Sequence, residues 1–385
     1  MTTFVSEHLE HWAIQKRRYL HQHPEISGDE YETTTYLKEQ LKALDLEILD
    51  YKEPGVVARL KGTVGEQTIA LRADIDALPI QEEGEKSYMS TVEGVSHMCG
   101  HDGHTAVLLA AAKWLSENRD RVCHNLLFIF QSSEEDLPSG ARILVEQGVM
   151  EGVDAVFGLH LYQPLEKGKI GIAHGPLMST ADDFTITIHG KGGHGSMPHE
   201  AVDPTYIASH VIQALQAYLV DKWTPREPSV ISIGHLAAGQ AYNVIPSTVT
   251  IGGTFRTFSE DTRTRVADRM KTVVEGICTS FDGTSTVQIG WGAPAVVNDS
   301  GMTDELEKIL GETFSKERIT EMTPMMGSED FSHYLEVAKG SYFLIGMGGE
   351  KSAYGHHHPK FDIDERVMKD AIESFIQIVL RFNQS

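Results

Sequence analysis

The sequence predicts an α/β protein of two domains. The larger domain should contain a mostly parallel sheet covered by helices, and a smaller satellite domain with a ferredoxin-like fold should be inserted into it. Strand-like and helix-like segments alternate in the first half of the chain, as they do in parallel sheets with helical crossovers. The chain has 385 residues, more than the roughly 250 to 300 at which a single hydrophobic core stops growing.

The first part of the chain supplies most of the larger domain. Apolar residues at helical spacing predict its helices, and short apolar or alternating runs predict its strands. The first helix should end before Pro24, because a residue that precedes proline disfavours the helical conformation. The expected helices are 7–21, 30–44, 105–118 and 141–147, and the expected strands are 46–51, 56–60, 68–73, 126–130 and 155–159.

From about residue 183 the order changes to strand, helix, strand, strand, helix, strand, which is typical of a ferredoxin-like unit. These segments are 184–189, 204–219, 230–234, 248–255, 262–279 and 286–291. The chain then returns to helix and strand, with a strand at 342–345 and a last helix at 365–382. We therefore predict that 182–292 form the inserted domain, and that 1–181 and 293–385 together form the larger one.

The charge of the chain excludes some classes of partner. A formal net charge of -22 repels phosphate backbones and anionic lipid surfaces. The longest basic cluster, residues 16–18, is interpreted as the solvated face of an amphipathic helix. We therefore expect neither a nucleic-acid nor a membrane partner.

The N-terminal segment and the cysteines indicate a cellular compartment. The first fourteen residues include Glu7 and Glu10 and lack the apolar run of a signal peptide, and no stretch approaches the ~20 apolar residues of a membrane span. Only three cysteines occur, at positions 99, 123 and 278. A sparse, odd set argues against a disulfide framework and for a reducing cytoplasm.

The strongest candidate for a metal site is Cys99-Gly100-His101-Asp102-Gly103-His104, just before a predicted helix. A thiolate and imidazoles at this spacing can bind a metal such as Zn²⁺, and glycine lets the backbone bend around it. A buried cysteine beside hydrogen-bonded histidines would have the same sequence. Further ligands are therefore needed to decide between the two interpretations.

Further candidate ligands follow predicted strands. Glu134 and Glu135 come after the strand at 126–130, and His160 follows the strand at 155–159. One of two adjacent carboxylates can bind a metal while the other remains free to act as a base. Ligands in parallel sheets bind beyond the carboxyl ends of strands, so these side chains are expected to converge.

Two more clusters fit the same site. Asp74 and Asp76 follow the strand at 68–73, where a carboxylate could bind a metal or orient an imidazole that does, or could simply be solvated. Three consecutive histidines, residues 356–358, stand in a loop near the C-terminus. They could be exposed residues without a functional role, or one of them could supply an imidazole ligand from a distant segment of the chain.

Taken together, these motifs resemble the metal-dependent amidohydrolases that include hippurate hydrolases, N-acyl-amino-acid deacylases, N-acetyldiaminopimelate deacetylases and auxin-conjugate hydrolases. The resemblance covers nearly the whole chain. The matching segments are 17–25, 72–79, 99–104, 134–135, 190–194, 198–199, 243–246, 327–331 and 357–359.

The resemblance implies two divalent metal ions, of Zn, Mn, Co or Ni, and a general base at Glu134. Among the tandem histidines it selects His357, because the family's ligand stands two residues before a proline; His358 is the second choice. Asp76 is expected to orient a ligand. The implied metal ligands are Cys99, His101, Glu135, His160 and His357.

The resemblance also assigns roles within the inserted domain. His194 would stabilise the oxyanion, in the active site of the partner subunit of a homodimer formed through this domain. Asn243, Arg256 and His199 would bind the substrate, with Arg256 pairing with its carboxylate. On sequence alone, Asn243 could instead form a loop turn and Arg256 a surface ion pair.

The implied activity is hydrolysis of the amide bond of a small N-acyl amino acid by a metal-activated water. Two alternatives stay open: a dipeptidase or carboxypeptidase, and a non-catalytic metal-dependent binding protein for acylated amino acids. Two positions depart from the family pattern. Ser132 and Ser133 stand where relatives carry Pro-Ala, and Asp74 stands where related peptidases place a metal-binding histidine.

Overall fold

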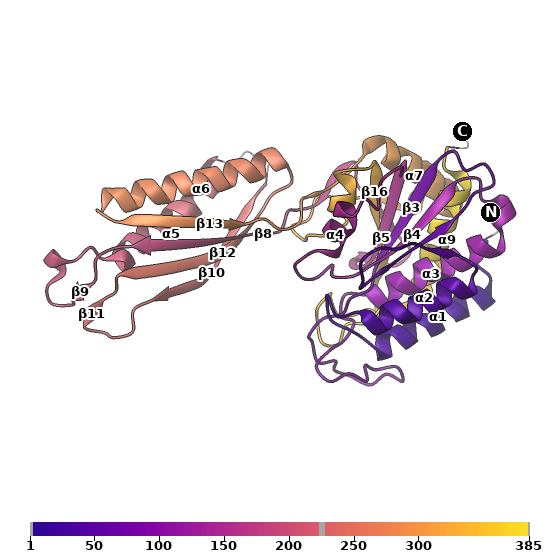
Figure 1. Cartoon of the computed structure of the whole chain (residues 1–385), viewed down its shortest axis with the longest axis horizontal. Helices are drawn as coiled ribbons and strands as arrows, with labels where there is room; N and C mark the ends of the chain where they lie inside the picture. Colours follow the sequence, from indigo (N-terminus) through magenta and orange to yellow (C-terminus); the bar gives the residue numbers. More distant parts are fainter. Residues whose placement is uncertain (1–2, 223–227, 384–385) are drawn as a thin grey trace. The chain divides into compact units, whose positions relative to one another are not determined.

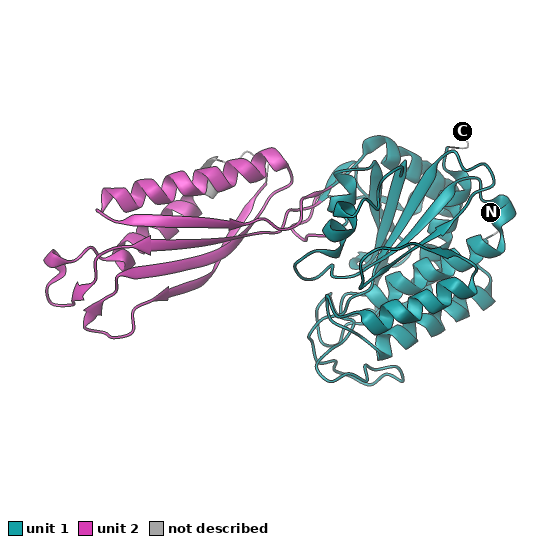
Figure 2. Cartoon of the chain, in the orientation of Figure 1, with its two compact units in different colours: residues 1–177, 297–323, 330–385 teal, residues 178–296, 324–329 magenta. Residues whose placement is uncertain are grey.

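The computed structural model describes residues 3–222 and 228–383 and has two units (Figure 2). Unit 1 comprises Met1–Leu177, Val297–Thr323 and Asp330–Ser385, and unit 2 comprises Met178–Val296 and Pro324–Glu329. The short segment Pro324–Glu329 was not expected to join the inserted part of the chain. Each unit has its own hydrophobic core, and each is described separately below.

Unit 1 contains an eight-stranded mixed sheet with the order β1-β2-β4-β3-β5-β16-β6-β15. Its centre is parallel, since β3 pairs in parallel with β4 and β5, and β16 pairs in parallel with β5. β1 and β2 add an antiparallel edge. The strands are β1 Glu47–Ile48, β2 Val56–Leu60, β3 Thr68–Asp74, β4 Asn125–Gln131, β5 Ala155–Glu166, β6 Ile170–Ile172, β15 Ile319–Glu321 and β16 Gly340–Gly348.

The helices of unit 1 pack around this sheet (Figure 1). α3 contacts β3, β4 and β5 of the sheet and also helices α1 and α9. α7 packs on α9 and β16. The helices are α1 Glu7–Gln22, α2 Tyr31–Ala43, α3 His101–Glu117, α4 Gly140–Glu146, α7 Ser300–Phe314, α8 Ser332–Leu335 and α9 Met368–Arg381.

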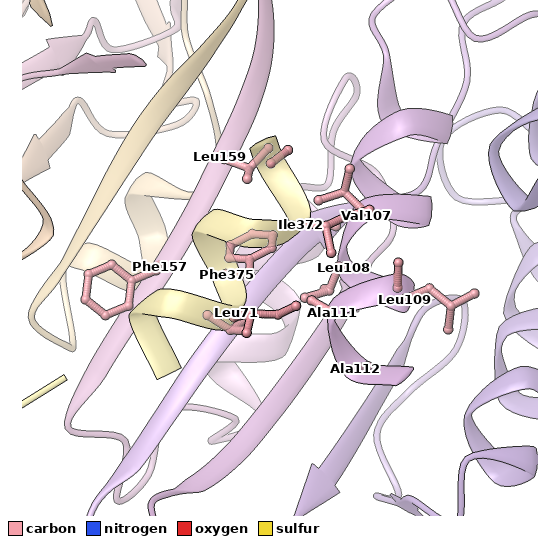
Figure 3. Packing of buried hydrophobic residues seen from close by; sticks show 14 of the residues in the cluster. Leu71, Val107, Leu108, Leu109, Ala111, Ala112, Phe157, Leu159, Ile372 and Phe375 are labelled. Atoms are coloured by element: carbon pink, nitrogen blue, oxygen red, sulfur yellow. The ribbon is translucent and has the colours of Figure 1, made fainter. Parts of the chain in front are cut away.

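α3 is the central helix of unit 1 because it is apolar on nearly every side. Residues 106–112 are all fully buried, and four of the seven are alanines, which let the neighbouring elements approach closely. Figure 3 shows side chains of α3 in the same buried cluster as Leu71 of β3, Phe157 and Leu159 of β5, and Phe375 of α9. The packing fixes the N-terminal end of α3, where His101 lies.

Unit 2 has the ferredoxin-like order that the sequence predicts. Its four-stranded antiparallel sheet has the order β10-β12-β8-β13, and helices α5 and α6 pack on each other. A small two-stranded sheet, β9 with β11, stands beside it. The elements are β8 Asp182–His189, β9 Gly193–His194, α5 Pro204–Lys222, β10 Val230–Ala238, β11 Val244–Ile245, β12 Thr248–Arg256, α6 Glu260–Ser280 and β13 Thr284–Gly290.

Some predicted boundaries were wrong. α3 begins at His101 rather than 105, because Gly100 adopts a left-handed φ of 105° directly before the helix. β5 does not end at 159 but continues through Glu166, because β16 pairs with it there. His160 therefore lies within a strand rather than after one.

The interpretation of residues 16–18 as a solvated face was wrong for Arg17, which is fully buried. Its Nε donates to Asp102 Oδ2 at 2.7 Å, and its Nη2 donates to Asp362 Oδ1 at 2.5 Å. These carboxylates are remote in sequence, so a charge run alone could not reveal the pairing. Across residues 3–222 and 228–383, no helix has the length and apolar character that a membrane crossing requires.

Candidate metal centre

Polar side chains gather where the parallel strands of unit 1 end. β3 ends at Asp74, Glu134 and Glu135 follow β4, and His160 lies in β5 just beyond its pairing with β3. Among the described residues, five groups have donor atoms within 4.8 Å of one another. Three of them consist of predicted ligands and the predicted base: Cys99 with His101 and His160, Cys99 with Glu135 and His357, and His101 with Glu134 and Glu135. The structure thus brings together the five predicted ligands and the predicted base.

The turn before α3 places two of these donors. Gly100, with its φ of 105°, separates Cys99 from His101, so the chain reverses sharply between them. His101 is then the first residue of a helix that the core holds in place. Its ring is 1% exposed.

The His101 ring is oriented by Asp76. His101 Nδ1 lies 3.0 Å from both Asp76 Oδ1 and the Asp76 carbonyl oxygen, so Nδ1 carries the proton and donates it. The lone pair of Nε2 is then free, and within the described residues this buried nitrogen has no hydrogen-bond partner. A carboxylate behind an imidazole in this way is the usual arrangement around a metal-bound histidine.

Asp76 itself is held as an anion. Although burial opposes ionisation, the hydrogen bond with His101 lowers the pKa of Asp76 below its usual value, as does the Glu135 amide, which donates to Asp76 Oδ2 at 3.0 Å. Asp76 therefore connects the His101 ring to the backbone of the paired glutamates. Asp74 and Asp76 are both buried, so a solvated strand-end turn is excluded for them.

His160 and Cys99 face each other across the centre. His160 Nδ1 donates to the Leu161 carbonyl oxygen at 2.9 Å, which leaves Nε2 directed at Cys99 Sγ, 3.5 Å away. Burial lowers the pKa of His160 well below its usual value, so the ring is the neutral form that binds metals. Burial, with Glu135 nearby, raises the pKa of the Cys99 thiol, so a thiolate there requires a cation.

Only one of the three tandem histidines reaches the carboxylates. His357 Nε2 lies 3.1 Å from Glu135 Oε1, and its φ of 66° turns the side chain away from its neighbours. His356 Nε2 instead accepts from the Gln163 amide at 3.2 Å. His358 stacks on Tyr354 and accepts from the Lys360 amide. The geometry therefore favours His357 over His358.

Glu134 and Glu135 reach His101 from one side. Glu134 Oε2 lies 4.0 Å and Glu135 Oε1 lies 3.9 Å from His101 Nε2. Burial lowers the pKa of His101, but the charge of Asp74 and the hydrogen bond to Asp76 outweigh burial, so this pKa lies well above its usual value. The surroundings of His101 Nε2 thus favour a positive charge at that point.

A buried network behind Asp74 was not predicted from the sequence. Arg72 donates to Asp74 Oδ2 and to Asp330 Oδ1, both at 2.7 Å, and its Nε donates to Gln131 Oε1 at 2.8 Å. Asp74 in turn accepts from His104 Nδ1 at 2.7 Å. Both Arg72 and Asp330 stand in segments that carry the family resemblance, which was the available signal.

His104 itself is an improbable metal ligand, although its ring lies close to Asp74 and His101. Its Nδ1 donates to Asp74, and its Nε2 accepts from the Leu161 amide at 2.9 Å. Both ring nitrogens are therefore occupied. We assign His104 a structural role, in which it fixes the end of β3 against β5.

The donor set fits a pair of divalent metal ions. Metal bonds of about 2.0 to 2.3 Å in a tetrahedral arrangement separate the ligand atoms by about 3 to 4 Å, and the distances above fall in this range. Sulfur, nitrogen and oxygen donors together suit borderline metals such as Zn²⁺, Co²⁺ or Ni²⁺, and carboxylates also accept Mn²⁺. The free, buried Nε2 of His101 is directed at the point where such an ion would bind.

Unit 2 brings His194 next to Asn243. β9 pairs with β11, and the Gly195 amide donates to the Asn243 carbonyl oxygen at 2.8 Å. His194 lines an open cleft of about 970 Å³ with residues 237–241 and 244–248. His194, Asn243 and His199 are all exposed. The ring of His194 has a local partner, since Ser196 Oγ lies 2.8 Å from His194 Nδ1.

Arg256 lies at the other end of unit 2. It is the last residue of β12, whose first residue, Thr248, follows the β11 strand that pairs with His194. Eight steps along a strand of about 3.3 Å each separate Arg256 from Thr248 by about 26 Å. Arg256 Nη1 donates to the Thr180 carbonyl oxygen at 3.4 Å. Within one copy of unit 2, Arg256 and His194 therefore cannot hold the same small molecule.

Comparison with known proteins gives a consistent result. Residues 70–381 match peptidase family M20/M25/M40. The chain is 38% identical over 381 residues to thermostable carboxypeptidase 2 of Saccharolobus solfataricus, covering 97% of this chain and 96% of that protein. It is 45% identical over 288 residues to an N-acyl-L-amino acid amidohydrolase of Geobacillus stearothermophilus, covering 74% and 78%.

A solved structure has the same fold over nearly the whole chain. A dinuclear metal binding peptidase from Bacillus subtilis superimposes with a TM-score of 0.86 at 34% identity, covering 97% of this chain and 98% of that one. The similarity spans both units.

Proposed function

Because the chain belongs to peptidase family M20/M25/M40, we propose that it hydrolyses the amide bond of small N-acyl amino acids at a two-metal centre in unit 1. The general base is Glu134. The metal ligands of this proposal are Cys99, His101, Glu135, His160 and His357.

One observation carries this proposal. The buried Nε2 of His101 is free, oriented by Asp76 behind it, and faced by Glu134 and Glu135 within 4.0 Å. A free imidazole nitrogen, a thiol and two carboxylates at one point are costly to bury unless a cation binds them.

The two metal ions, when bound, would polarise the amide carbonyl and make water a stronger acid and nucleophile. The protein supplies the proton transfers. Glu134 accepts a proton from the attacking water and then gives it to the amide nitrogen as the C–N bond breaks, so that water and amide become carboxylic acid and amine. Glu135 binds metal instead, since it is the carboxylate that lies near both Cys99 and His357.

The substrate class follows from the chemistry that the relatives share. These relatives include a carboxypeptidase and an N-acyl-L-amino acid amidohydrolase, and both activities release an amino acid that carries a free carboxylate. Arg256 and Asn243 are our candidates to bind that carboxylate, with Arg256 forming two parallel hydrogen bonds. His199 lies in the same exposed region as His194 and is a further candidate.

The distance within unit 2 supports a role for a second copy of the chain. Thr248 and Arg256, the two ends of β12, are about 26 Å apart, and His194 lines the same cleft as Thr248. One small substrate can therefore meet both His194 and Arg256 only if they come from different subunits. β10 is an edge strand with exposed Leu236 and Val230, which suits pairing with another copy. We therefore propose a homodimer formed through unit 2, in which His194 stabilises the oxyanion in the partner's site, and a cytoplasmic location.

The test is hydrolysis of a panel of N-acetyl amino acids, N-benzoyl amino acids and dipeptides by chelator-stripped enzyme resupplied with Zn²⁺, Mn²⁺, Co²⁺ or Ni²⁺. The proposal expects metal-restored release of the amino acid from the acylated substrates. Faster cleavage of dipeptides would assign a peptidase instead. No cleavage of any substrate, with metal bound, would favour a binding protein.

A further inference from the structure

The segment between α1 and α2, residues 24–30, contacts residues that adjoin the proposed ligands and general base of the metal centre. Its backbone runs parallel to the end of β3, with a bridge between Ile26 and Ala77 and a hydrogen bond of 2.8 Å from the Ala77 amide to the Glu25 carbonyl oxygen. The Glu25 carboxylate accepts from the Thr33 amide at 2.7 Å and so caps α2. The segment is therefore held at both ends.

Ser27 extends this contact to the residue that orients a metal ligand. Its Oγ donates to Asp76 Oδ2 at 2.7 Å. The same carboxylate oxygen accepts from the Glu135 amide, and Asp76 Oδ1 accepts from His101 Nδ1, both at 3.0 Å. Ser27 thus restrains the one carboxylate that touches both His101 and the backbone of Glu135.

Glu30 makes a second contact, with the loop that carries the general base. Glu30 Oε1 accepts from the Ser133 amide at 2.8 Å. Ser133 has a φ of 48°, a left-handed conformation that is uncommon for a residue with a side chain and needs support from its surroundings. Ser133 directly precedes Glu134, so the hydrogen bond to Glu30 fixes the direction in which the paired glutamates leave β4.

The burial of Glu30 indicates a specific role. The residue is fully buried, and its Oε2 has no hydrogen-bond partner among the described residues. A carboxyl group in this position is costly for stability. A residue chosen only for packing would be apolar there, whereas a restraint on the Ser133 amide requires an acceptor.

We infer that Ser27 and Glu30 are positioning residues of the two-metal hydrolase, an inference that rests on the proposed function. Ser27 acts through Asp76 on His101 and Glu135, and so on the affinity for metal. Glu30 acts through Ser133 on Glu134, and so on turnover. Neither side chain touches the substrate or the reacting atoms.

The experiment compares Glu30→Ala, Glu30→Gln and Ser27→Ala with Asp29→Ala, an exposed position in the same segment. For Glu30→Ala we expect kcat to fall about 10-fold to 100-fold, with KM within twofold and metal content unchanged. Glu30→Gln keeps an oxygen that accepts from Ser133, so it should recover most of kcat. Ser27→Ala should weaken Zn²⁺ binding about 10-fold in competition with a chelator.

The outcomes separate this inference from the proposed function. Kinetics and Zn²⁺ affinity equal to those of Asp29→Ala in all three variants would overturn the inference. So would a Glu30→Gln variant as impaired as Glu30→Ala, since the acceptor oxygen would then not matter. If the wild-type enzyme cleaves no amide, the proposed function fails, but the Zn²⁺ affinity of Ser27→Ala still tests the role of Ser27.

Discussion

The candidate residues of unit 1 and unit 2 differ in how far the protein has arranged them in advance. In unit 1, His101 and His160 are at most 8% exposed, and each has one ring nitrogen bonded so that the other faces the centre. In unit 2, His194, His199 and Asn243 are exposed, and they line or border an open cleft. The candidate residues of unit 1 are therefore arranged within their own unit, whereas those of unit 2 stand at an open, exposed surface.

The largest loss of kcat is expected from Glu134→Gln, a change in the candidate site of unit 1. Removing the general base should lower kcat by about 10²-fold to 10⁴-fold, while metal content stays at the wild-type value because Glu134 is not a proposed ligand. Steady-state kinetics and metal analysis measure both. Asp136→Asn, an exposed neighbour, is the matched control. Near-normal turnover of Glu134→Gln with metal bound would remove Glu134 from the mechanism.

A stability change confined to unit 2 should leave the metal centre intact. Asp182 accepts a bidentate pair from Arg263, with Nη2 to Oδ1 at 2.6 Å and Nε to Oδ2 at 2.9 Å, and both residues are buried. Asp182→Ala leaves the guanidinium without its buried carboxylate partner, which should cost about 3 to 5 kcal/mol of unfolding free energy.

Denaturant unfolding followed by circular dichroism measures this cost, and the Zn²⁺ affinity should stay within twofold of wild type. A large loss of Zn²⁺ affinity in Asp182→Ala would show that the centre of unit 1 depends on unit 2, which contradicts the comparison.

His194→Ala should lower kcat about 10²-fold to 10³-fold, the usual cost of removing one donor to an oxyanion. Metal content should not change, because His194 is not among the metal ligands. His235→Ala, an exposed histidine on β10 of the same unit, is the control. If the two variants have equal kcat values, the exposed residues of unit 2 do not take part in the chemistry.

The smallest expected effect concerns pH and Glu30. Burial, together with the charge of Asp76, raises the pKa of Glu30 from 4.5 to about 7, although the Ser133 amide opposes the shift. Between these values the folded chain binds more protons at Glu30 than the unfolded chain, so stability falls as pH rises from about 4.5 to 7. The loss amounts to at most about 3 kcal/mol.

Glu30→Gln cannot ionise, so it should lack this loss. Unfolding free energies of the two proteins at pH 5 and pH 7.5 measure the difference. If the unfolding free energies of the wild-type protein and of Glu30→Gln change equally with pH, then folding does not raise the pKa of Glu30.

Local patterns predicted the elements of the fold better than its long-range pairings. β2 spans Val56–Leu60 as expected, because its apolar residues and flanking turns define it locally. β5 was predicted too short, since its second half is a strand only because β16 lies beside it. Arg17 was assigned to a solvated surface, because its partners, Asp102 and Asp362, are 85 and 345 residues away in the sequence.

In the candidate site, too, local features were easier to predict than long-range contacts. Motif resemblance selected His357 among three adjacent histidines. The geometry that supports this choice combines a local feature, the left-handed φ of His357, with a contact to Glu135, which is 222 residues away in the sequence. Ser27 and Glu30 were not selected, although they stand beside the matching segment 17–25. Their partners, Asp76 and Ser133, become neighbours only after the strands assemble.

The most direct test of the central claim is a metal titration of the chelator-stripped enzyme, with N-acyl amino acid hydrolysis measured at each step. The account predicts that the wild-type chain binds two equivalents of Zn²⁺ and that activity appears as both sites fill. Cys99→Ala should lose tight binding of both ions, since its sulfur belongs to two donor groups, one with His101 and His160 and one with Glu135 and His357. Full activity in the stripped enzyme, or unchanged Zn²⁺ binding in Cys99→Ala, would contradict the account.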